Sequence, residues 1–516
     1  MSPEQRALVA PYVTSLDSPV FVLKNLPEEV VAVLFAYYSR SREDLRSNLL
    51  KLLQEQELDV GGSLLQAPAD EAGLELARRK AKEFHERWVV GYGHASVAEH
   101  AVAHVAIEDV SILASKVIEY NRLASYTEKS TRYVPFARAY YPAHELEGDA
   151  GRIYHSAVGT LFDTYETLLE PVTERVMDTA DRSPFKTDRG FRNSCQAQAC
   201  DALRYLLPAA TYTNIGLTAN ARLLEHMVSK LLSHPLQELQ TSGERIRDEA
   251  TKVIPTLIKY ARRKDYFVET PPAMRTMAKA PPAGRVGRMG EWKTPPSLAS
   301  LVHSPEDPEA RLAAAILYEF SEEPYEQIRK RVAALPRGDQ ERIITEYLQR
   351  RRTYGDEKHG YTDPPLRSLE HLEFTFEIVV DYGAYRDIQR HRMATQTTQR
   401  LTTALGYDVP ELLEQYGFGE RFRQAMDQAA SAYETLAREF PEEAQYVVPL
   451  AFRKRVLFTW NLRELHHFIS LRSARQGHIS YRRVAWAVYD ELKEKHPFLA
   501  SFIRVDRDEY DLARPG

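Results

Sequence analysis

Three cationic or protonatable side chains stand side by side at Arg390, His391 and Arg392, within the segment RDIQRHRMATQTTQR. Small hydroxyl and amide residues follow them directly. A guanidinium group presents a planar fork of N–H donors that matches a phosphate or a carboxylate. On a helix, Arg386 and Arg390 would lie four residues apart on one face. Taken alone, the segment fits a solvated helix turn as well as a pocket for an anionic ligand.

A second segment with anion-binding chemistry lies at 120–134 and reads YNRLASYTEKSTRYV. In a loop, Ser130, Thr131 and Arg132 could hold a phosphate through backbone N–H groups, hydroxyls and a guanidinium fork. Glu128 stands just before them. The alternative is that the hydroxyl residues end a helix and Arg132 faces water.

The two segments belong to halves of the chain that repeat each other. Glu-His dipeptides at 99–100 and 370–371 both precede period-2 alternation, which over 372–378 predicts a half-buried strand. A helical pattern follows in each half, over the segments SILASKVIEYNRLASYTEKS and AYRDIQRHRMATQTTQR. Asn220 and Asn461 stand 12 positions after Pro208 and Pro449, and each Asn begins an Asn-x-Arg motif. Several unrelated letters agree at fixed spacing, which indicates an internal duplication.

The elements that position these residues are predicted to be mostly helices. A Pro/Gly-rich stretch at 266–300 is the best linker candidate, and it separates a first domain at 1–265 from a second at 301–516. Amphipathic helical patterns fill most of both halves. We expect a helix-rich α+β fold with two homologous domains, each with a small sheet packed on helices.

Composition excludes several classes of protein. A net charge of -5 gives no global attraction to nucleic acid or to an anionic membrane, and no segment reaches the ~20 apolar residues of a membrane span. Cys195 and Cys200 are the only cysteines; they fit structural roles in a loop that runs into a helix, and their spacing does not suit zinc. We expect a cytoplasmic protein. The segment QRRRTYGDEKHGY interleaves Arg and Tyr, which could bind single-stranded nucleic acid, but its acidic residues neutralise the basic patch and argue against this function.

The two segments together resemble the signature of the flavin-dependent thymidylate synthases, Arg-His-Arg-x-x-Ser-x-Asn-x-x-Ser-x-Arg-Tyr. RHRMATQTTQRLTT carries the beginning of that signature, with Thr395 in place of the first Ser. YNRLASYTEKSTRY carries its end, with Ser130, Arg132 and Tyr133 in register. The resemblance covers most of both halves, and the signature is whole in neither.

The losses in the two halves are complementary. Members of that family are homotetramers whose sites lie between chains. The resemblance implies that one set of nucleotide contacts survives only in the second half, at Arg390 and Arg472, because Leu231 stands opposite Arg472. The other set survives only in the first half, at Glu128 to Arg132. One composite site would form from unlike halves, each chain would mimic a dimer, and a homodimer would mimic the tetramer.

The resemblance implies reductive methylation of deoxyuridine monophosphate (dUMP) to thymidine monophosphate (dTMP). Methylenetetrahydrofolate would give the carbon, and FAD reduced by NADPH would give the hydride. The catalytic residue carried over is Arg472. The substrate-binding residues are Arg390, Glu128, Ser130, Thr131, Arg132 and Arg472. The cofactor-binding residues are His94, His391, Arg392, Asn461, Arg463 and His467. No metal site is expected.

Two departures from the signature leave an alternative open. Asp387 stands where the family has Gln, and an anion there needs pairing with Arg386 or Arg390 if a phosphate is to bind nearby. Thr127 and Thr397 both stand where the signature has Asn. The alternative is a catalytically inactive protein that binds a flavin or a nucleotide.

Overall fold

The computed structural model describes residues 1–38, 42–54, 95–279, 297–351 and 363–508. The chain divides into two compact units that do not coincide with its two halves. The first unit consists of Met1–Val110, Val117–Lys129 and Thr213–Val286. The second consists of Ser111–Lys116, Ser130–Tyr212 and Gly287–Gly516. The second unit therefore combines part of the first half with the whole described second half.

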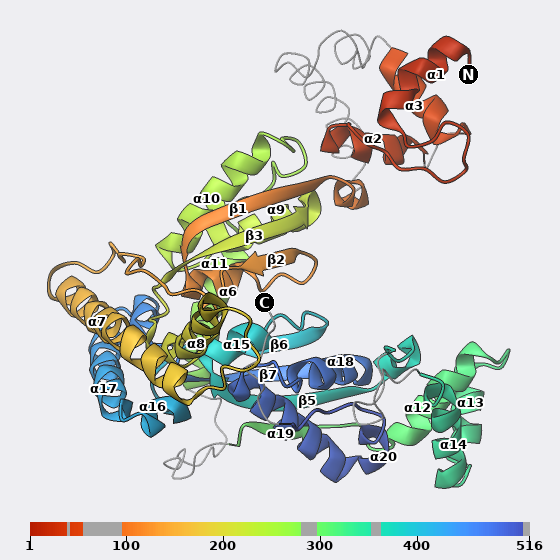
Figure 1. The fold of residues 1–516 in the computed structure, drawn as a ribbon. Coiled ribbons are helices and arrows are strands. Elements are labelled where there is room, and N and C mark those ends of the chain that lie inside the picture. Colours follow the sequence, from red (N-terminus) through yellow and green to blue (C-terminus); the bar gives the residue numbers. More distant parts are fainter. Residues whose placement is uncertain (39–41, 55–94, 280–296, 352–362, 509–516) are drawn as a thin grey trace. The chain divides into compact units, whose positions relative to one another are not determined.

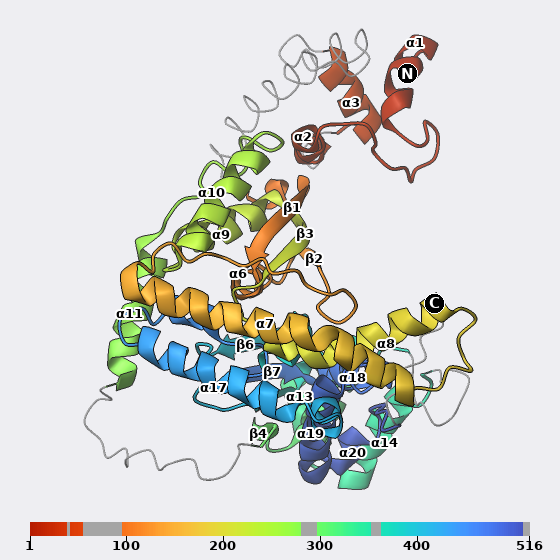
Figure 2. The same cartoon turned by 60° about the vertical axis from the view of Figure 1, so that its left-hand side comes forward.

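The first unit carries a three-stranded antiparallel sheet in the order β1-β3-β2, with α9 and α10 on one side of it (Figures 1 and 2). Its strands are β1 (Val102–Ser111), β2 (Ser125–Glu128) and β3 (Tyr212–Asn220). Its helices are α1 (Pro3–Val9), α2 (Glu28–Tyr38), α3 (Leu45–Gln54), α9 (Ala221–Leu232), α10 (Gln237–Thr251) and α11 (Asp265–Lys279), with 3-10 turns η1 (Ala10–Tyr12) and η4 (Ala95–Glu99). Helix α6 (Ile112–Ile118) crosses the unit boundary.

The second unit is built on a four-stranded sheet in the order β4-β5-β7-β6, in which every neighbour is antiparallel. Its strands are β4 (Ala299–His303), β5 (Glu373–Asp381), β6 (Ala394–Thr398) and β7 (Arg453–Asn461). Its helices are α7 (Gly148–Thr179), α8 (Asp188–Leu203), α12 (Pro308–Glu319), α13 (Tyr325–Ala333), α14 (Arg337–Leu348), α15 (Tyr382–Ile388), α16 (Glu411–Gln415), α17 (Gly419–Leu436), α18 (Leu462–Arg472), α19 (Ile479–Lys495) and α20 (Pro497–Ala500), with 3-10 turns η5 (Arg204–Leu206), η7 (Arg367–His371) and η8 (Glu443–Val447). Helices α7 and α17 lie side by side in both views (Figures 1 and 2).

The sheets of the two units have the same register. Ser125 pairs with Thr218 in the first sheet, and Thr395 pairs with Thr459 in the second. Equivalent side chains also cap equivalent helices, because Asn220 and Asn461 accept hydrogen bonds of 2.9 and 2.8 Å from backbone N–H groups of α9 and α18. The predicted α+β class with two homologous, sheet-containing domains is confirmed.

Equivalent segments of the two halves meet around Pro208 and Pro449, which form an antiparallel bridge within the second unit. Ala209 N donates to Val448 O at 2.9 Å, and the matching bond runs from Leu450 N to Leu207 O at 3.0 Å. Each bond is the image of the other when the halves are exchanged. Isologous contacts of this kind are typical of a two-fold dimer interface, and here one chain forms the contact with itself.

The structure corrects part of the expected secondary structure. The strand predicted over 372–378 is confirmed as β5, whose inward residues Phe374, Phe376 and Ile378 are fully buried. The long helices predicted after each first strand are wrong, because α6 and α15 end at Ile118 and Ile388 and are followed by β2 and β6. Pairing to β3 and β7 decides the structure of these polar, threonine-rich segments.

In two further segments the observed secondary structure differs from the one that the sequence predicted. The first part of the 266–300 segment is helical, as α11, and contains Pro271 and Pro272. Cys195 and Cys200 both lie inside α8 as buried free thiols, and burial raises the pKa of Cys200 to about 11. Among the described helices, none has the length and apolar content needed to cross a membrane.

Candidate active site

Arg132 is held by the carboxylate of Asp201, in the last turn of α8. Its Nε and Nη2 donate hydrogen bonds of 2.8 and 2.9 Å to the two carboxylate oxygens. Only 10% and 11% of the two side chains are exposed. A bidentate pair fixes both the position and the plane of a guanidinium group. Arg132 therefore lies in a buried, charged setting and not in a solvated loop.

Tyr481 connects Arg132 with Arg472. Arg132 Nη1 donates a 3.1 Å hydrogen bond to the Tyr481 hydroxyl. The guanidinium carbons of Arg132 and Arg472 lie 5.8 and 5.3 Å from the centre of the Tyr481 ring, within the range of cation–π contacts. Gly477 leaves room for this ring, since a Cβ there would lie 2.6 Å from Cε2 of Tyr481. A residue of the first half and one of the second thus share one aromatic neighbour.

A hydrogen-bond chain runs from Glu464 through His391 to Arg472. His391 Nδ1 lies 3.0 Å from Glu464 Oε1, and Arg472 Nε donates to His391 Nε2 over 2.9 Å. Because arginine can only donate, Nε2 is the acceptor and Nδ1 carries the proton. Burial, with a contribution from Arg472, keeps the pKa of His391 well below its ordinary value. The neutral imidazole therefore fixes the orientation of Arg472.

Asp387 lies among arginines. Burial alone would raise the pKa of its carboxyl, but the surrounding cations outweigh burial and hold that pKa below its ordinary value. In order of effect, these cations are Arg204, Arg472, Arg390 and Arg132. Asp201 is a second carboxylate of the cluster, and the carboxyl of Asp381 also interacts with Arg204. The four guanidinium groups outnumber these three carboxyl groups. The cluster is therefore suited to an anionic ligand.

Arg204 is the most buried cation of this cluster, with 2% of its side chain exposed. Its Nη1 lies 3.8 Å from Asp387 Oδ2, so Arg204 acts on Asp387 together with Arg390. Its Nε lies 3.9 Å from Asp201 Oδ1, within ion-pair distance, and neither Nε nor Nη2 has a hydrogen-bond partner in the described residues. Buried donors without a partner are uncommon in native proteins and need an explanation, such as a bound ion.

Two further contacts hold the elements around the cluster together. His478 Nδ1 accepts the backbone N–H of Ser480 at 3.1 Å, so Nε2 carries the proton, and it lies 3.8 Å from Asp201 Oδ1. Burial lowers the pKa of His478 to about 4. Ser480 Oγ donates to Asp381, whose other oxygen accepts the Ala384 N–H at 2.6 Å. The first turns of α15 and α19 are thereby joined.

Residues 130–134, the end of the segment 120–134 singled out from the sequence, meet the segment 386–400 in the second unit. Arg386 Nη1 donates a 3.2 Å hydrogen bond to Thr131 Oγ1. The expectation that Arg386 and Arg390 share a helix face is wrong, because α15 ends at Ile388 and Arg390 is exposed in the following turn. Ser130 directly precedes Thr131 in the chain, and its hydroxyl accepts the backbone N–H of Arg132 at 3.2 Å.

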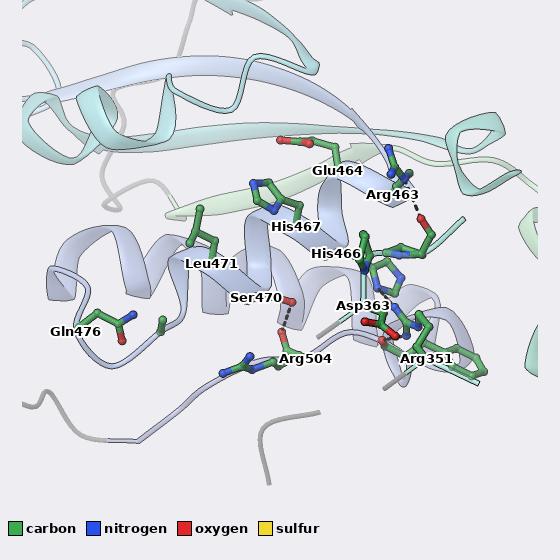
Figure 3. Close-up of a pocket in the computed structure, with 14 residues that line it drawn as sticks. Arg351, Asp363, Arg463, Glu464, His466, His467, Ser470, Leu471, Gln476 and Arg504 are labelled. Atoms are coloured by element: carbon green, nitrogen blue, oxygen red, sulfur yellow. Dashed lines mark hydrogen bonds between the residues drawn. The ribbon is translucent and has the colours of Figure 1, made fainter. Parts of the chain in front are cut away.

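A cavity of about 510 Å³ lies along α18 in the same unit (Figure 3). Two of the predicted cofactor residues, Arg463 and His467, line it. The ring of a third, His391, lies 5.4 Å from that of His467. The complete lining comprises Arg351, Asp363, Pro364, Pro365, Arg463, Glu464, His466, His467, Ser470, Leu471, Ala474, Gln476, Phe502 and Arg504.

Other predicted site residues have different positions. His94 lies outside the described residues, and Glu128 is buried at the end of β2 in the first unit. The Asn461 side chain caps α18. Arg463 donates to Pro365 O at 2.9 Å and pairs with Glu370 at 3.1 Å. Arg392 is half-buried in the turn before β6.

The family model described as thymidylate synthase complementing protein matches residues 37–256 and 300–498. The chain belongs to this family. Both matched regions contain the strand and helix repeat described above, so the family model and the internal duplication agree.

Relatives of two kinds resemble the chain. A UPF0159 protein of Chlamydia muridarum is 38% identical over 99% of this chain and 97% of its own length. One of Thermoplasma acidophilum is 31% identical, with 85% of this chain and 91% of the relative covered. A flavin-dependent thymidylate synthase of Sulfolobus acidocaldarius is 31% identical, over 28% of this chain and 57% of that enzyme.

One solved structure also resembles the chain. It is a flavin-dependent thymidylate synthase from Helicobacter pylori complexed with FAD and dUMP, at 19% identity over 40% of this chain and 99% of that one. Its TM-score of 0.29 is too low to support a structural argument.

Sequence reasoning missed several members of the cluster: Asp201, Arg204, Glu464, His478 and Tyr481. Asp201 and Arg204 are three residues apart and precede Pro208 of the repeated Pro-to-Asn segment, so comparison of the halves could have found them. Gln445 stands at the position of Arg204 in the second half. No signal in one sequence marks Tyr481, since its role depends on the meeting of the two halves.

Proposed function

We propose that this thymidylate synthase complementing family member converts dUMP to dTMP by reductive methylation, at one composite site per chain. Methylenetetrahydrofolate is the carbon donor, and FAD, reduced by NADPH, is the cofactor. The observation that carries the proposal is the meeting of Arg132 and Arg472 at Tyr481, because these residues come from different halves.

The nucleotide phosphate is assigned to Arg132, Ser130 and Arg390, with Arg204 added. A phosphate monoester carries a charge of about -1.5 to -2 near pH 7, and several arginines in one place favour its binding. Arg204 offers two buried donors, Nε and Nη2, that lack a hydrogen-bond partner in the described residues, although Nε lies 3.9 Å from Asp201 Oδ1. Thr131 and Glu128 complete the proposed set of substrate contacts.

Arg472 is assigned to the pyrimidine and is the proposed catalytic residue. Negative charge develops on a ring oxygen when carbon is transferred to the base, and a fixed cation in a site with little water stabilises that charge. The hydrogen bond to His391 and the contact with Tyr481 hold Arg472 before the substrate binds. A cation that is already oriented needs no reorganisation during the reaction.

The cavity along α18 fits part of a flavin dinucleotide. A volume of about 510 Å³ falls within the usual range of ligand pockets. Its wall combines apolar Leu471 and Phe502 with cationic Arg463. We assign His467 and Arg463 to the cofactor directly, and His391, Arg392 and Asn461 to its surroundings. His94, which lies outside the described residues, stays a proposed cofactor contact without an assigned position. When bound, the flavin supplies the hydride, and the protein supplies position and charge.

The full-length protein provides the test. The purified chain is expected to show flavin absorption bands that bleach with NADPH, and to release tritium from [5-³H]dUMP when methylenetetrahydrofolate is present. A colourless protein that takes up neither FAD nor dUMP would disprove the proposal.

A second candidate is a protein that binds flavin or nucleotide without turnover. The position of Asp387 favours it, since a buried anion beside the proposed phosphate site opposes the phosphate charge. Nucleotide binding without tritium release would support this second candidate.

We also propose the coarser features of the molecule. Domains at 1–265 and 301–516 are joined by the 266–300 linker. The chain is cytoplasmic, forms a homodimer that mimics a tetramer, and binds dUMP, folate and NADPH but neither nucleic acid nor membrane.

A further inference from the structure

Residues 502–508, the last described segment of the chain, cross α18 beyond the point where the family match ends, at residue 498. Arg351 Nη2 donates to Phe502 O at 2.7 Å. The Ser470 hydroxyl of α18 donates to Arg504 O at 3.1 Å (Figure 3). The chain therefore continues in a fixed path along α18 after the part that the family model describes.

Asp506 bonds this segment to the connection that follows α18. The Asp506 side chain is buried, and its backbone N–H donates to Ser473 Oγ at 2.9 Å. One carboxylate oxygen accepts the backbone N–H of Arg475 at 3.2 Å, and the other accepts that of Asp508 at 2.9 Å. Ser473 is the C-cap residue of α18 and directly follows Arg472. Asp506 thus holds the chain at the point where the helix of Arg472 ends.

Two side chains of α19 hold the same segment from the other side. Arg482 is fully buried and donates from Nε to Ser473 O at 2.9 Å and from Nη2 to Asp508 O at 2.6 Å. Trp486 Nε1 donates to Asp506 O at 2.8 Å. One guanidinium group therefore joins the end of α18 to the C-terminal segment.

The connection at 473–478 separates the two residues that meet in the nucleotide cluster. Arg472 is the last residue of α18, and Tyr481 lies in the first turn of α19. A shift of the backbone between the two helices would move both the guanidinium group and the ring. Asp506 bonds to backbone and hydroxyl groups of this connection, so it acts on the cluster through the positions of Arg472 and Tyr481.

The first half of the chain has a similar crossing without the carboxylate. Lys264 N donates to the hydroxyl of Ser233, the C-cap residue of α9, at 2.9 Å. In the connection that follows, His234 Nδ1 accepts the Leu236 N–H at 3.2 Å. Leu231 stands there in place of Arg472. Among the described contacts, the carboxylate thus holds the connection in the half whose helix ends in Arg472.

We propose that Asp506 is a positioning residue, which fixes the connection between α18 and α19 and thereby aligns Arg472 and Tyr481 for the nucleotide. The inference rests on the proposed function for the role of these two residues. Coupling between two sites is reciprocal, so a bound nucleotide also stabilises the C-terminal segment.

Hydrogen exchange and dUMP titration of the full-length protein test the proposal. Asp506→Ala and Asp506→Asn are compared with the wild type, and Asp508→Ala is the control, because Asp508 is exposed and bonds through its backbone. In Asp506→Ala we expect faster exchange over 473–482 and a roughly tenfold loss of dUMP affinity, the size expected for a hydrogen bond to a charged group. Asp506→Asn keeps one acceptor oxygen and should recover part of both. In the wild type, dUMP should slow exchange over 502–508.

Wild-type dUMP affinity in Asp506→Ala, or an equal loss in Asp508→Ala, would overturn the inference and leave the proposed function standing. If Asp506→Ala does not fold, as judged by circular dichroism, Asp506→Asn and the effect of dUMP on exchange over 502–508 decide the question. If the wild type binds no dUMP, the proposed function fails. Exchange over 473–482 then decides the inference: faster exchange in Asp506→Ala alone supports the positioning role, and equal exchange contradicts it.

Discussion

Arg132 Nη1 donates a 3.1 Å hydrogen bond to the hydroxyl of Tyr481, a residue 349 positions later in the chain. This contact joins the retained end of the family signature to the helix that follows Arg472. The second unit contains Arg132 of the first half and Arg472 of the second half, whereas Glu128 lies in the first unit. The consequences can be measured residue by residue.

Tyr481→Phe removes the hydroxyl that Arg132 contacts but keeps the ring beside Arg472. Hydrogen bonds to charged groups contribute about 1.5–3 kcal/mol, so we expect dUMP affinity to fall roughly tenfold. Tyr489→Phe on the same helix is the matched control, because Tyr489 lies against Arg507 and not against the cluster. Equal affinity of both variants, measured by calorimetric titration, would contradict the proposed role of Tyr481.

Gly477→Ala tests the space that the Tyr481 ring requires. The added Cβ would lie 2.6 Å from the ring and 2.9 Å from Ala474 O, so one of them must move. Overpacking of this kind costs about 1–3 kcal/mol, and we expect lower stability together with weaker dUMP binding. Gly338→Ala in α14 meets no atom within 4 Å and should be neutral or stabilising. Urea denaturation of the two variants makes the comparison, and equal stability would exclude the packing argument.

Asp201→Asn leaves the Arg132 guanidinium buried without its counter-charge. Removing one partner of a buried ion pair lowers the free energy of unfolding by about 3–5 kcal/mol. The control is Asp188→Asn in the first turn of the same helix, where the pair with Arg182 is exposed and worth about 1 kcal/mol or less. We further expect phosphate to restore part of the melting temperature of Asp201→Asn only. If the free energy of unfolding of Asp201→Asn, measured by denaturation, fell no more than that of Asp188→Asn, the pair between Arg132 and Asp201 would not be important for folding.

His478 should make the protein sensitive to acid. Its pKa is about 4 in the folded state and about 6.5 in the unfolded chain, so the unfolded state binds the proton first. The neutral form stabilises the fold fully above pH 6.5, and this stability is lost as pH falls toward 4. At about 1.4 kcal/mol per pH unit, the loss is roughly 3 kcal/mol. His478→Asn keeps an acceptor for the Ser480 N–H and should make the dependence of unfolding free energy on pH between 7 and 5 less steep, while buried His391 continues to contribute with the same sign. A profile as steep as that of the wild type would exclude His478 as its cause.

The sequence predicted what depends on local pattern. The alternation of apolar and polar residues over 372–378 predicted strand β5. The matching Pro-to-Asn segments predicted the duplication, and the equivalent strand registers and helix caps of the two halves agree with it. The polar segments after α6 and α15 were misread as helices because Thr and Gln do not specify a strand without β3 and β7 beside them. Pairing between residues some 60 to 90 positions apart decided these structures, and a local window does not contain that information.

The candidate site likewise contains residues that the sequence predicted and residues that only the structure revealed. Arg390, His391 and Arg132 were recognisable from a linear motif. Asp201 and Tyr481 were not, because they become neighbours of Arg132 only through packing between the halves. Asp387 has a counter-ion in Arg204, whose Nη1 lies 3.8 Å from Asp387 Oδ2 and which belongs to the other half of the chain. The structure thus supplies counter-ions that a motif in one half cannot contain.

Titration of dUMP into wild type, Arg132→Met, Arg390→Met and Arg122→Met tests the composite site most directly. Arg122 is the first-half counterpart of Arg392 and serves as the control. We predict one nucleotide per chain in the wild type, loss of binding in Arg132→Met and in Arg390→Met, and wild-type binding in Arg122→Met. Two nucleotides per chain, or unchanged affinity without Arg132, would contradict a single site formed by unlike halves.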